Sequence, residues 1–200
     1  MQKILLPVNE IFVSIQGEGL NFGKIALFIR FGKCNLHCEF CDTKYAWNNF
    51  ELIPEKNIID ILKKNRKITS FLIITGGEPC LYDLQNIIKK AKQFGYTIAV
   101  ETNGTIYQKW LEMVDWITVS PKNEKIDKKV LKLADELKFV ILNKKSFKLV
   151  NRFMPFNPVI LQPVDNNKKI AKLILKEIQK SKYKKFFRLG IQLQKVYGFK

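Results

Sequence analysis

The sequence predicts an α/β protein, a single-domain, incomplete TIM-like barrel of parallel strands with helices on its outside. Short apolar runs, rich in β-branched and aromatic residues, alternate with longer amphipathic runs about six times, as buried parallel strands and crossover helices do. The 200 residues are also too few for eight full strand–helix units, which take about 250. A doubly wound sheet remains open from the pattern alone.

Each apolar run is expected to be a strand, and each amphipathic run between two of them a helix. The expected strands are residues 25–31, 71–75, 97–101, 116–119, 137–141 and 158–161. The expected helices are residues 54–67, 83–94, 124–134 and 166–180. Residues 10–15 could add a strand that pairs as a hairpin with the first of these. We therefore expect one domain over residues 1–200, with an N-terminal strand or hairpin extension of about residues 1–20.

The net charge is unusual, because 35 Lys and Arg residues face 18 Asp and Glu residues, which gives +17. Nucleic-acid readout favours Arg, and Arg stands only at positions 30, 66, 152 and 188. The lysines are spread along helix faces, so we expect them to be solvated and expect no nucleic-acid partner. No run approaches the roughly 18 apolar residues of a membrane span, and residues 1–10 lack a secretory signal, so the cytoplasm is expected.

Polar clusters follow the C-terminal ends of the expected strands. Five such clusters occur, at residues 34–43, 75–79, 101–104, 120–122 and 162–165. In parallel α/β folds these ends meet at one rim, and ligands bind there. The sequence therefore predicts a single site at this rim.

Three of the four cysteines, Cys34, Cys38 and Cys41, stand in one short loop, where all three thiolates can face one centre. Structural zinc takes four ligands, usually in two separated pairs. A four-iron cluster held by three thiolates keeps one iron open to a small molecule. His37 is a conceivable zinc ligand but has no partner histidine, so we interpret it as a loop residue. Cys80 is expected to pack as a small apolar side chain.

The loop and the segment Gly76-Gly77-Glu78-Pro79 resemble the radical S-adenosylmethionine superfamily. The resemblance extends to the 7-carboxy-7-deazaguanine synthase family and runs from about residue 9 to the C-terminus. It rests on Gln16-Gly17-Glu18-Gly19, Phe28-Ile29-Arg30, Cys41-Asp42-Thr43, Glu101-Thr102-Asn103-Gly104, Ser120-Pro121-Lys122, Leu137-Lys138-Phe139-Val140 and Leu161-Gln162-Pro163.

The resemblance implies a lyase that converts 6-carboxy-5,6,7,8-tetrahydropterin to 7-carboxy-7-deazaguanine with loss of ammonia, in queuosine and 7-deazapurine biosynthesis. The implied cofactors are a [4Fe-4S] cluster, S-adenosylmethionine and Mg²⁺. A 5′-deoxyadenosyl radical takes hydrogen from C6 of the pterin, so no catalytic side chain is assigned. The implied partners are the pterin, a reducing electron donor such as flavodoxin or ferredoxin, and a second copy of the chain in a homodimer.

Cofactor residues carry over position by position. Cys34, Cys38 and Cys41 would hold the cluster, and Thr43, which is otherwise a turn residue, would bind Mg²⁺. Glu101 is either an acceptor for ribose or an amino group, or a carboxylate that caps a turn. The other residues implied for S-adenosylmethionine are Phe40, Asp42, Gly77, Glu78, Ser120, Pro121, Lys122, Gln162, Pro163, Val164 and Asp165.

Substrate residues carry over in the same way. Arg30 would clamp the pterin carboxylate, since its planar fork suits bidentate pairing, and otherwise it would be a surface ion pair. The other implied contacts are Ile15, Gln16, Gly17, Thr75, Gln192 and Lys200. The tail departs from the family, because Gln194 stands where His is usual and Lys200 where proline is usual. Gln can form hydrogen bonds but cannot carry a proton.

Two other functions stay open at this point. Another radical enzyme, such as an activator of a glycyl-radical partner, would share the cysteines and Gly-Gly-Glu-Pro but not Gln16-Gly17-Glu18. A zinc- or RNA-binding module would account for the charge and the cysteines alone.

Overall fold

The computed structural model describes residues 4–200, and the first three residues of the expected N-terminal extension lie outside them. Its strands are β1 (Leu5–Ile15), β2 (Ile25–Phe31), β3 (Glu51–Pro54), β4 (Phe71–Gly76), β5 (Thr97–Thr102), β6 (Trp116–Val119), β7 (Glu136–Ile141), β8 (Val159–Pro163) and β9 (Phe187–Leu189). Its α-helices are α1 (Glu55–Asn65), α2 (Gln85–Gln93), α3 (Lys128–Leu133), α4 (Phe147–Arg152), α5 (Lys168–Lys180) and α6 (Leu193–Tyr197).

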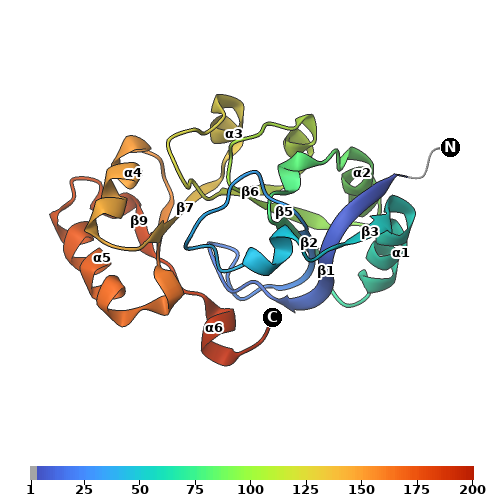
Figure 1. The fold of residues 1–200 in the computed structure, drawn as a ribbon, viewed down its shortest axis with the longest axis horizontal. Helices are drawn as coiled ribbons and strands as arrows, with labels where there is room; N and C mark the ends of the chain where they lie inside the picture. The colour runs from blue at the N-terminus through green and yellow to red at the C-terminus, as the bar shows by residue number, and fades with distance from the viewer. Residues whose placement is uncertain (1–3) are drawn as a thin grey trace.

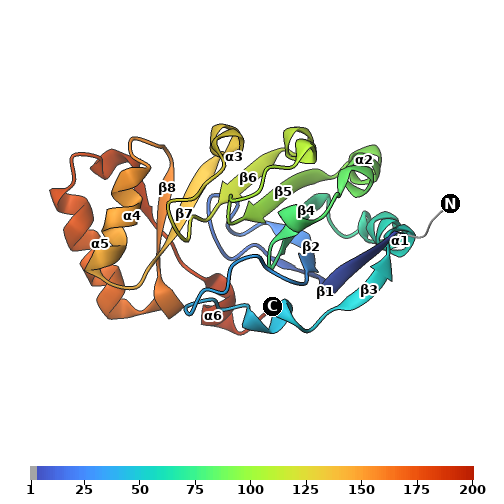
Figure 2. The same ribbon diagram turned by 45° about the horizontal axis from the view of Figure 1, so that its top comes forward.

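All strands belong to one sheet with the order β3-β1-β2-β4-β5-β6-β7-β8-β9. From β2 to β9 every neighbouring pair is parallel, and the strand order rises along the chain. A doubly wound sheet would reverse direction at a switch point, and this sheet does not. The sheet curls into an open arc with α1 to α5 on its outer side (Figures 1 and 2). The predicted incomplete barrel is therefore confirmed.

The N-terminal strand is longer than expected, since β1 covers eleven residues. It pairs antiparallel with β2 on one side and with β3 on the other, which closes one edge of the parallel sheet with a three-stranded antiparallel part. The short strands β3 and β9 and the short helices α4 and α6 were not expected from the sequence. Among residues 4–200, no helix is long and apolar enough to cross a membrane.

The main core lies between the sheet and the outer helices. On β2, Leu27, Ile29 and Phe31 point outward and are buried there with residues of α1 and α2 such as Ile58 and Ile87. Because side chains alternate along a strand, residues of the opposite parity face the inside of the arc. The inner face therefore exposes Phe28 and Arg30 of β2, Ile73 and Thr75 of β4, and Lys138 and Val140 of β7 to the cavity.

The longest helix, α5, carries five of the 35 Lys and Arg residues. Every lysine of α5 is exposed, whereas Ile174 of the same helix is buried against the sheet. This amphipathic division matches the expectation of solvated helix faces.

Candidate active site

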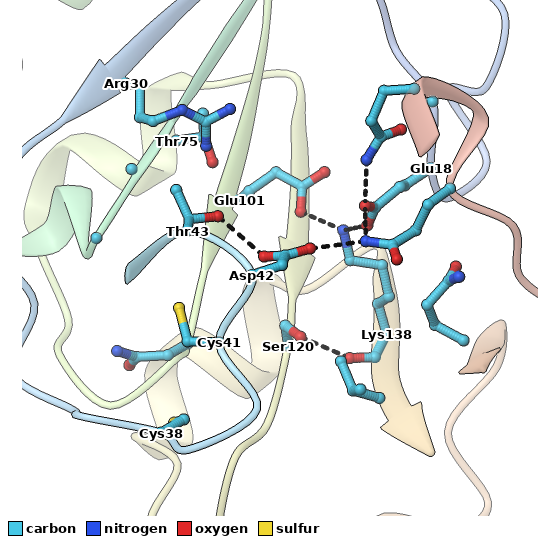
Figure 3. A pocket seen from close by; sticks show the side chains of 18 of the residues that line it. Glu18, Arg30, Cys38, Cys41, Asp42, Thr43, Thr75, Glu101, Ser120 and Lys138 are labelled. Atoms are coloured by element: carbon cyan, nitrogen blue, oxygen red, sulfur yellow. Dashed lines mark hydrogen bonds and ion pairs between the residues drawn. The ribbon is translucent and has the colours of Figure 1, made fainter. Parts of the chain in front are cut away.

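A cavity opens on the inner side of the arc, where the strands end (Figure 3). Its lining comes from β1, β2, β4, β5, β7 and β8, the loops after β1 and β6, the cysteine loop, and the C-terminal segment. Of the site residues predicted from the sequence, Glu78 and Pro121 are outside the lining. The others line it: Ile15, Gln16, Gly17, Arg30, Cys34, Cys38, Phe40, Cys41, Asp42, Thr43, Thr75, Gly77, Glu101, Ser120, Lys122, Gln162, Pro163, Val164, Asp165, Gln192 and Lys200.

The cysteine loop leaves β2 through Lys33, whose φ of 61° turns the chain inward. Its thiols are free and half-buried, and all three face the cavity. The amide of Cys41 donates to the carbonyl of Cys38 at 3.1 Å, which folds the second half of the loop into a turn. Burial raises the pKa of the Cys34 and Cys38 thiols, and the ammonium of Lys122 partly offsets this at Cys38.

The donor set of three thiols can hold a four-iron cluster. Among residues 4–200, no three His, Cys, Asp or Glu side chains gather closely enough to hold one ion. A four-iron cluster does not need its three thiolates to converge on one atom, because each thiolate binds a different iron. The ring of His37 packs edge-on against Trp47 at 4.8 Å, which matches its interpretation as a loop residue. Cys80 is fully buried in the main core, as expected.

The Gly-Gly-Glu-Pro turn packs directly on the cysteine loop. The amide of Gly77 donates to Phe31 O and the amide of Glu78 to Lys33 O, both at 2.9 Å. A Cβ added at Gly77 would lie 1.8 Å from Lys33 O and 3.1 Å from Cys34 N. Only glycine permits this approach, so the backbone of Gly77 borders the cavity beside the first cysteine.

The side chain of Glu78 has a different place from the one expected. Its carboxylate is fully buried and accepts hydrogen bonds from Thr102 Oγ1 and Asn103 N at 2.7 Å and from Cys80 N at 3.0 Å. These contacts tie the turn to the end of β5 behind the cavity wall. Glu78 therefore supports the rim and does not face a ligand's ammonium group in this structure.

Arg30 lies on the inner face of β2, next to Thr75 of β4 in the strand register (Figure 3). Its guanidinium lies between the rings of Phe12 and Tyr45, at 5.9 and 6.0 Å. Within the described residues it forms one ion pair, from Nε to Glu10 Oε1 at 2.8 Å. The Nη groups are therefore available for an anion in the cavity.

Ser120 and Lys122 form one hydrogen-bonded unit at the end of β6. Lys122 Nζ donates to Ser120 Oγ at 2.7 Å, and Ser120 Oγ donates to Lys138 O at 2.8 Å. The ammonium lies 5.9 Å from the ring of Phe40. Burial, and then the charge of Lys138, lowers the pKa of Lys122. The sequence-predicted residues Phe40, Ser120 and Lys122 thus come together.

At the end of β8 the chain turns sharply over the cavity. Asp165 and Asn166 have left-handed φ values of 49° and 52°. Gln162 is buried, and its Oε1 has no hydrogen-bond partner in the described part of the chain. That oxygen packs against Gly190, since a Cβ added there would lie 2.4 Å from it.

Sequence reasoning missed a buried charge network in the cavity wall. Lys138 Nζ binds Glu18 Oε2 at 2.7 Å and Glu101 Oε2 at 2.5 Å. The expected substrate residues Gln16 and Gln192 join it, since they donate to Glu101 at 3.0 Å and to Glu18 at 3.0 Å. A signal was present, because Lys138 interrupts the otherwise apolar run of the expected strand 137–141. A lone charge at such a position needs a buried partner.

Two further contacts involve Thr43, the predicted Mg²⁺ ligand, and Lys200, a predicted substrate residue. Thr43 Oγ1 donates to Asp42 Oδ1 at 2.9 Å, which leaves the lone pairs of the hydroxyl open to a cation. Lys200 Nζ donates to Glu10 Oε2 at 2.7 Å, so the C-terminal lysine lies in the same corner as Arg30.

Comparisons with known proteins show the family of this chain. A family model for the radical SAM superfamily matches residues 28–140. The 7-carboxy-7-deazaguanine synthase of Buchnera aphidicola (subsp. Schizaphis graminum) is 35% identical, over 94% of this chain and 96% of that protein. The enzyme of the same name from Aquifex aeolicus is 35% identical, over 98% of this chain and 95% of that protein.

A solved structure shares the fold. The crystal structure of QueE from Escherichia coli superposes with a TM-score of 0.79 at 23% identity, over 94% of both chains. Streptococcus suis SuiB bound to S-adenosylmethionine superposes with a TM-score of 0.56 at 16% identity. That match covers 81% of this chain and 51% of SuiB. At these identities the two structures support the fold alone.

Proposed function

This chain belongs to the 7-carboxy-7-deazaguanine synthases of the radical SAM superfamily, and from that premise we propose how its own residues serve their reaction. The enzyme converts 6-carboxy-5,6,7,8-tetrahydropterin to 7-carboxy-7-deazaguanine with loss of ammonia. The observation that carries the assignment of roles is that the three thiols and the Arg30 guanidinium face one cavity. A cluster site and a carboxylate clamp would therefore share one cavity.

Cys34, Cys38 and Cys41 would hold the [4Fe-4S] cluster and leave its fourth iron for the methionine end of S-adenosylmethionine. When bound, the cluster and S-adenosylmethionine supply the one-electron cleavage that starts the chemistry at C6 of the pterin. The backbone of Gly77 would border the methionine group. Glu78 would act indirectly, by holding that turn against β5 through its buried hydrogen bonds.

The nucleoside part of S-adenosylmethionine would lie along the cavity wall between the cysteine loop and the ends of β6 and β8. Phe40 supplies an apolar face there, and Lys122 and Ser120 supply a cation and a hydroxyl. Gln162 would border the nucleoside from the buried end of β8. The remaining candidates are Asp42, Glu101, Pro121, Pro163, Val164 and Asp165.

The pterin would lie against β1 and β2, with its carboxylate at Arg30 and Thr75. Arg30 can offer its Nη groups because Glu10 takes Nε. Gln16, Gln192 and Lys200 would contact the ring or the carboxylate, together with Ile15 and Gly17. The side chains and the shape of this cavity would orient C6 and exclude water.

Thr43 would bind Mg²⁺, with substrate and water oxygens completing the shell, because one hydroxyl is a weak site by itself. A reducing partner such as flavodoxin or ferredoxin would supply electrons, and the exposed lysines would favour an acidic one. We also infer a homodimer and a cytoplasmic location, in keeping with the family and with reduced cysteines.

The test is an anaerobic assay of the reconstituted enzyme with 6-carboxytetrahydropterin, S-adenosylmethionine, dithionite and Mg²⁺. Formation of 7-carboxy-7-deazaguanine, detected by mass, is the expected result. A fully loaded cluster with no deazapurine product would refute the assignment. Tight zinc binding without iron uptake would refute every radical mechanism for this chain.

A further inference from the structure

Lys138 is a cation buried in the wall of the cavity. It projects from the inner face of β7, and its side chain is 8% exposed. Burial alone would lower its pKa, but the carboxylates of Glu101 and Glu18 raise the pKa well above its usual range. The two ion pairs therefore favour the charged form of Lys138.

Its two carboxylate partners come from separate parts of the chain. Glu18 lies in the loop after β1, and Glu101 lies near the end of β5. Glu136, two residues before Lys138, accepts from the amide of Leu20 at 2.9 Å. Strand β7 thus binds the loop between β1 and β2 at two points on the same face, as the period of two requires.

Glu18 also binds the C-terminal segment, residues 192–195, and so connects this segment to Lys138. Its Oε2 is taken by Lys138, and its Oε1 accepts from Gln192 Nε2 at 3.0 Å and from Gln194 Nε2 at 2.9 Å. The amide of Leu193 also donates to Gly17 O at 3.1 Å. Figure 3 shows Glu18 between Lys138 and two amide side chains. The carboxylate is therefore shared between the strand and the segment.

The same segment touches the cysteine loop. Gln192 Nε2 donates to Asp42 Oδ2 at 2.7 Å, directly after Cys41 in the sequence. A chain of charged and polar contacts therefore runs from β7 through Glu18 and Gln192 to the loop that carries the thiols. Each link is a charge-assisted hydrogen bond, stronger than a neutral one and directional.

We propose that Lys138 is a positioning residue that, through Glu18, holds residues 192–195 in place as one wall of the substrate cavity. The cation keeps Glu18 ionised and fixed, so that both of its oxygens have defined donors. Glu101 is held by the same ammonium on the substrate side. The consequence for catalysis rests on the function proposed above, whereas the structural link does not.

The experiment compares four forms of the reconstituted holoenzyme: wild type, Lys138→Met, Lys138→Arg and Lys92→Met. Lys92 is the matched control, because it pairs with Asp115 at 2.5 Å on the exposed surface away from the cavity. Hydrogen–deuterium exchange of residues 192–200 is the first measurement. We expect exchange about tenfold faster in Lys138→Met, partial rescue in Lys138→Arg and no change in Lys92→Met.

Steady-state kinetics give the second measurement. A positioning role predicts that Lys138→Met raises the KM for the pterin at least about tenfold, with a smaller change in the KM for S-adenosylmethionine. Partial rescue by Lys138→Arg should appear in the same parameter. Equal changes in both KM values would contradict a role in shaping the substrate wall.

Lys138→Met leaves two buried carboxylates without their cation and can fail to fold. Glu18→Gln avoids this, because Lys138 keeps Glu101 as its partner. The same faster exchange at residues 192–195 is expected there, with cluster content unchanged. Unchanged exchange in Glu18→Gln would overturn the proposal. If the wild type makes no deazapurine, the proposed function fails, but the exchange result still decides the structural link.

Discussion

Glu10 and Arg30 face each other across β1 and β2, and Arg30 Nε donates to Glu10 Oε1 at 2.8 Å. Lys200 Nζ binds the other carboxylate oxygen. Burial alone would raise the pKa of Glu10, but the hydrogen bonds from Lys200 and Arg30 lower it. One carboxylate therefore orients two cations at the edge of the cavity, and the Nη groups of Arg30 are not used in that ion pair.

Arg30→Ala should weaken binding of the pterin about 10- to 100-fold, because charge-assisted hydrogen bonds to a carboxylate are lost. Anaerobic calorimetry, with the pterin and S-adenosylmethionine titrated separately, measures this effect. The affinity for S-adenosylmethionine should change much less. Equal loss of both affinities would indicate a general disturbance of the fold and not a carboxylate clamp.

Cys34→Ala should abolish the iron–sulfur absorbance after anaerobic reconstitution, because two thiolates do not retain the cluster. The matched control is Cys80→Ala, which removes a thiol that is fully buried in the main core. The control should keep about four irons per chain, as the wild type does. Iron loss in the control, or retention in Cys34→Ala, would contradict the assignment.

Much of this fold could be predicted because parallel strands that are buried on both faces appear in the sequence as continuous apolar runs. The predicted bounds 25–31 and 116–119 agree with β2 and β6 to the residue. The helix expected at 124–134 begins only at Lys128, because the Asp127 carboxylate accepts from the Lys129 amide and caps it there. The strands β3 and β9 escaped prediction because they are short edge strands, and tertiary pairing determines such strands.

The site could be predicted at the level of the rim but not of every side chain. Turn motifs at strand ends locate the rim, whereas the direction of a single side chain depends on which donors surround it. Glu78 illustrates the limit, since backbone and hydroxyl donors of β5 draw its carboxylate away from the cavity. Lys138 illustrates a missed signal, because its partners Glu18 and Glu101 are 120 and 37 residues away in the chain.

Thr43→Val should raise the Mg²⁺ concentration needed for half-maximal activity, because valine keeps the shape of threonine without its oxygen ligand. Thr118→Val is the matched control, since that hydroxyl donates to Glu136 at 2.8 Å and is not part of the cavity lining. A Mg²⁺ titration of the rate measures both variants. An unchanged midpoint in Thr43→Val would argue against Thr43 as a ligand.

Gly77→Ala should impair cluster loading although it removes no ligand. The new methyl group would lie 1.8 Å from Lys33 O, so the backbone that leads into Cys34 must move. Iron content after reconstitution should fall below about half of the wild-type value. Gly23→Ala is the control, because a Cβ there meets nothing within 4 Å although its φ of +86° carries strain. Full iron loading in Gly77→Ala would show that the loop tolerates the shift.

Acid should destabilise the protein partly through Glu18. Burial alone would raise its pKa, but Lys138 and the amides of Gln192 and Gln194 lower it to about 2. A carboxyl group with a lowered pKa in the folded state stabilises the fold above its unfolded pKa of 4.5. That contribution disappears as the pH falls from there through the folded value.

The free energy of unfolding of Glu18→Gln should therefore fall less than that of the wild type between about pH 6 and pH 3.5, in urea titrations. Burial raises the pKa of Glu78 and Glu136, and such groups act in the opposite direction. The difference between wild type and variant isolates Glu18, because the other groups are common to both. Glu124→Gln, which removes an exposed pair with Arg152, should match the wild-type slope. Identical slopes for Glu18→Gln and wild type would show that Lys138 does not hold Glu18 ionised in the folded chain.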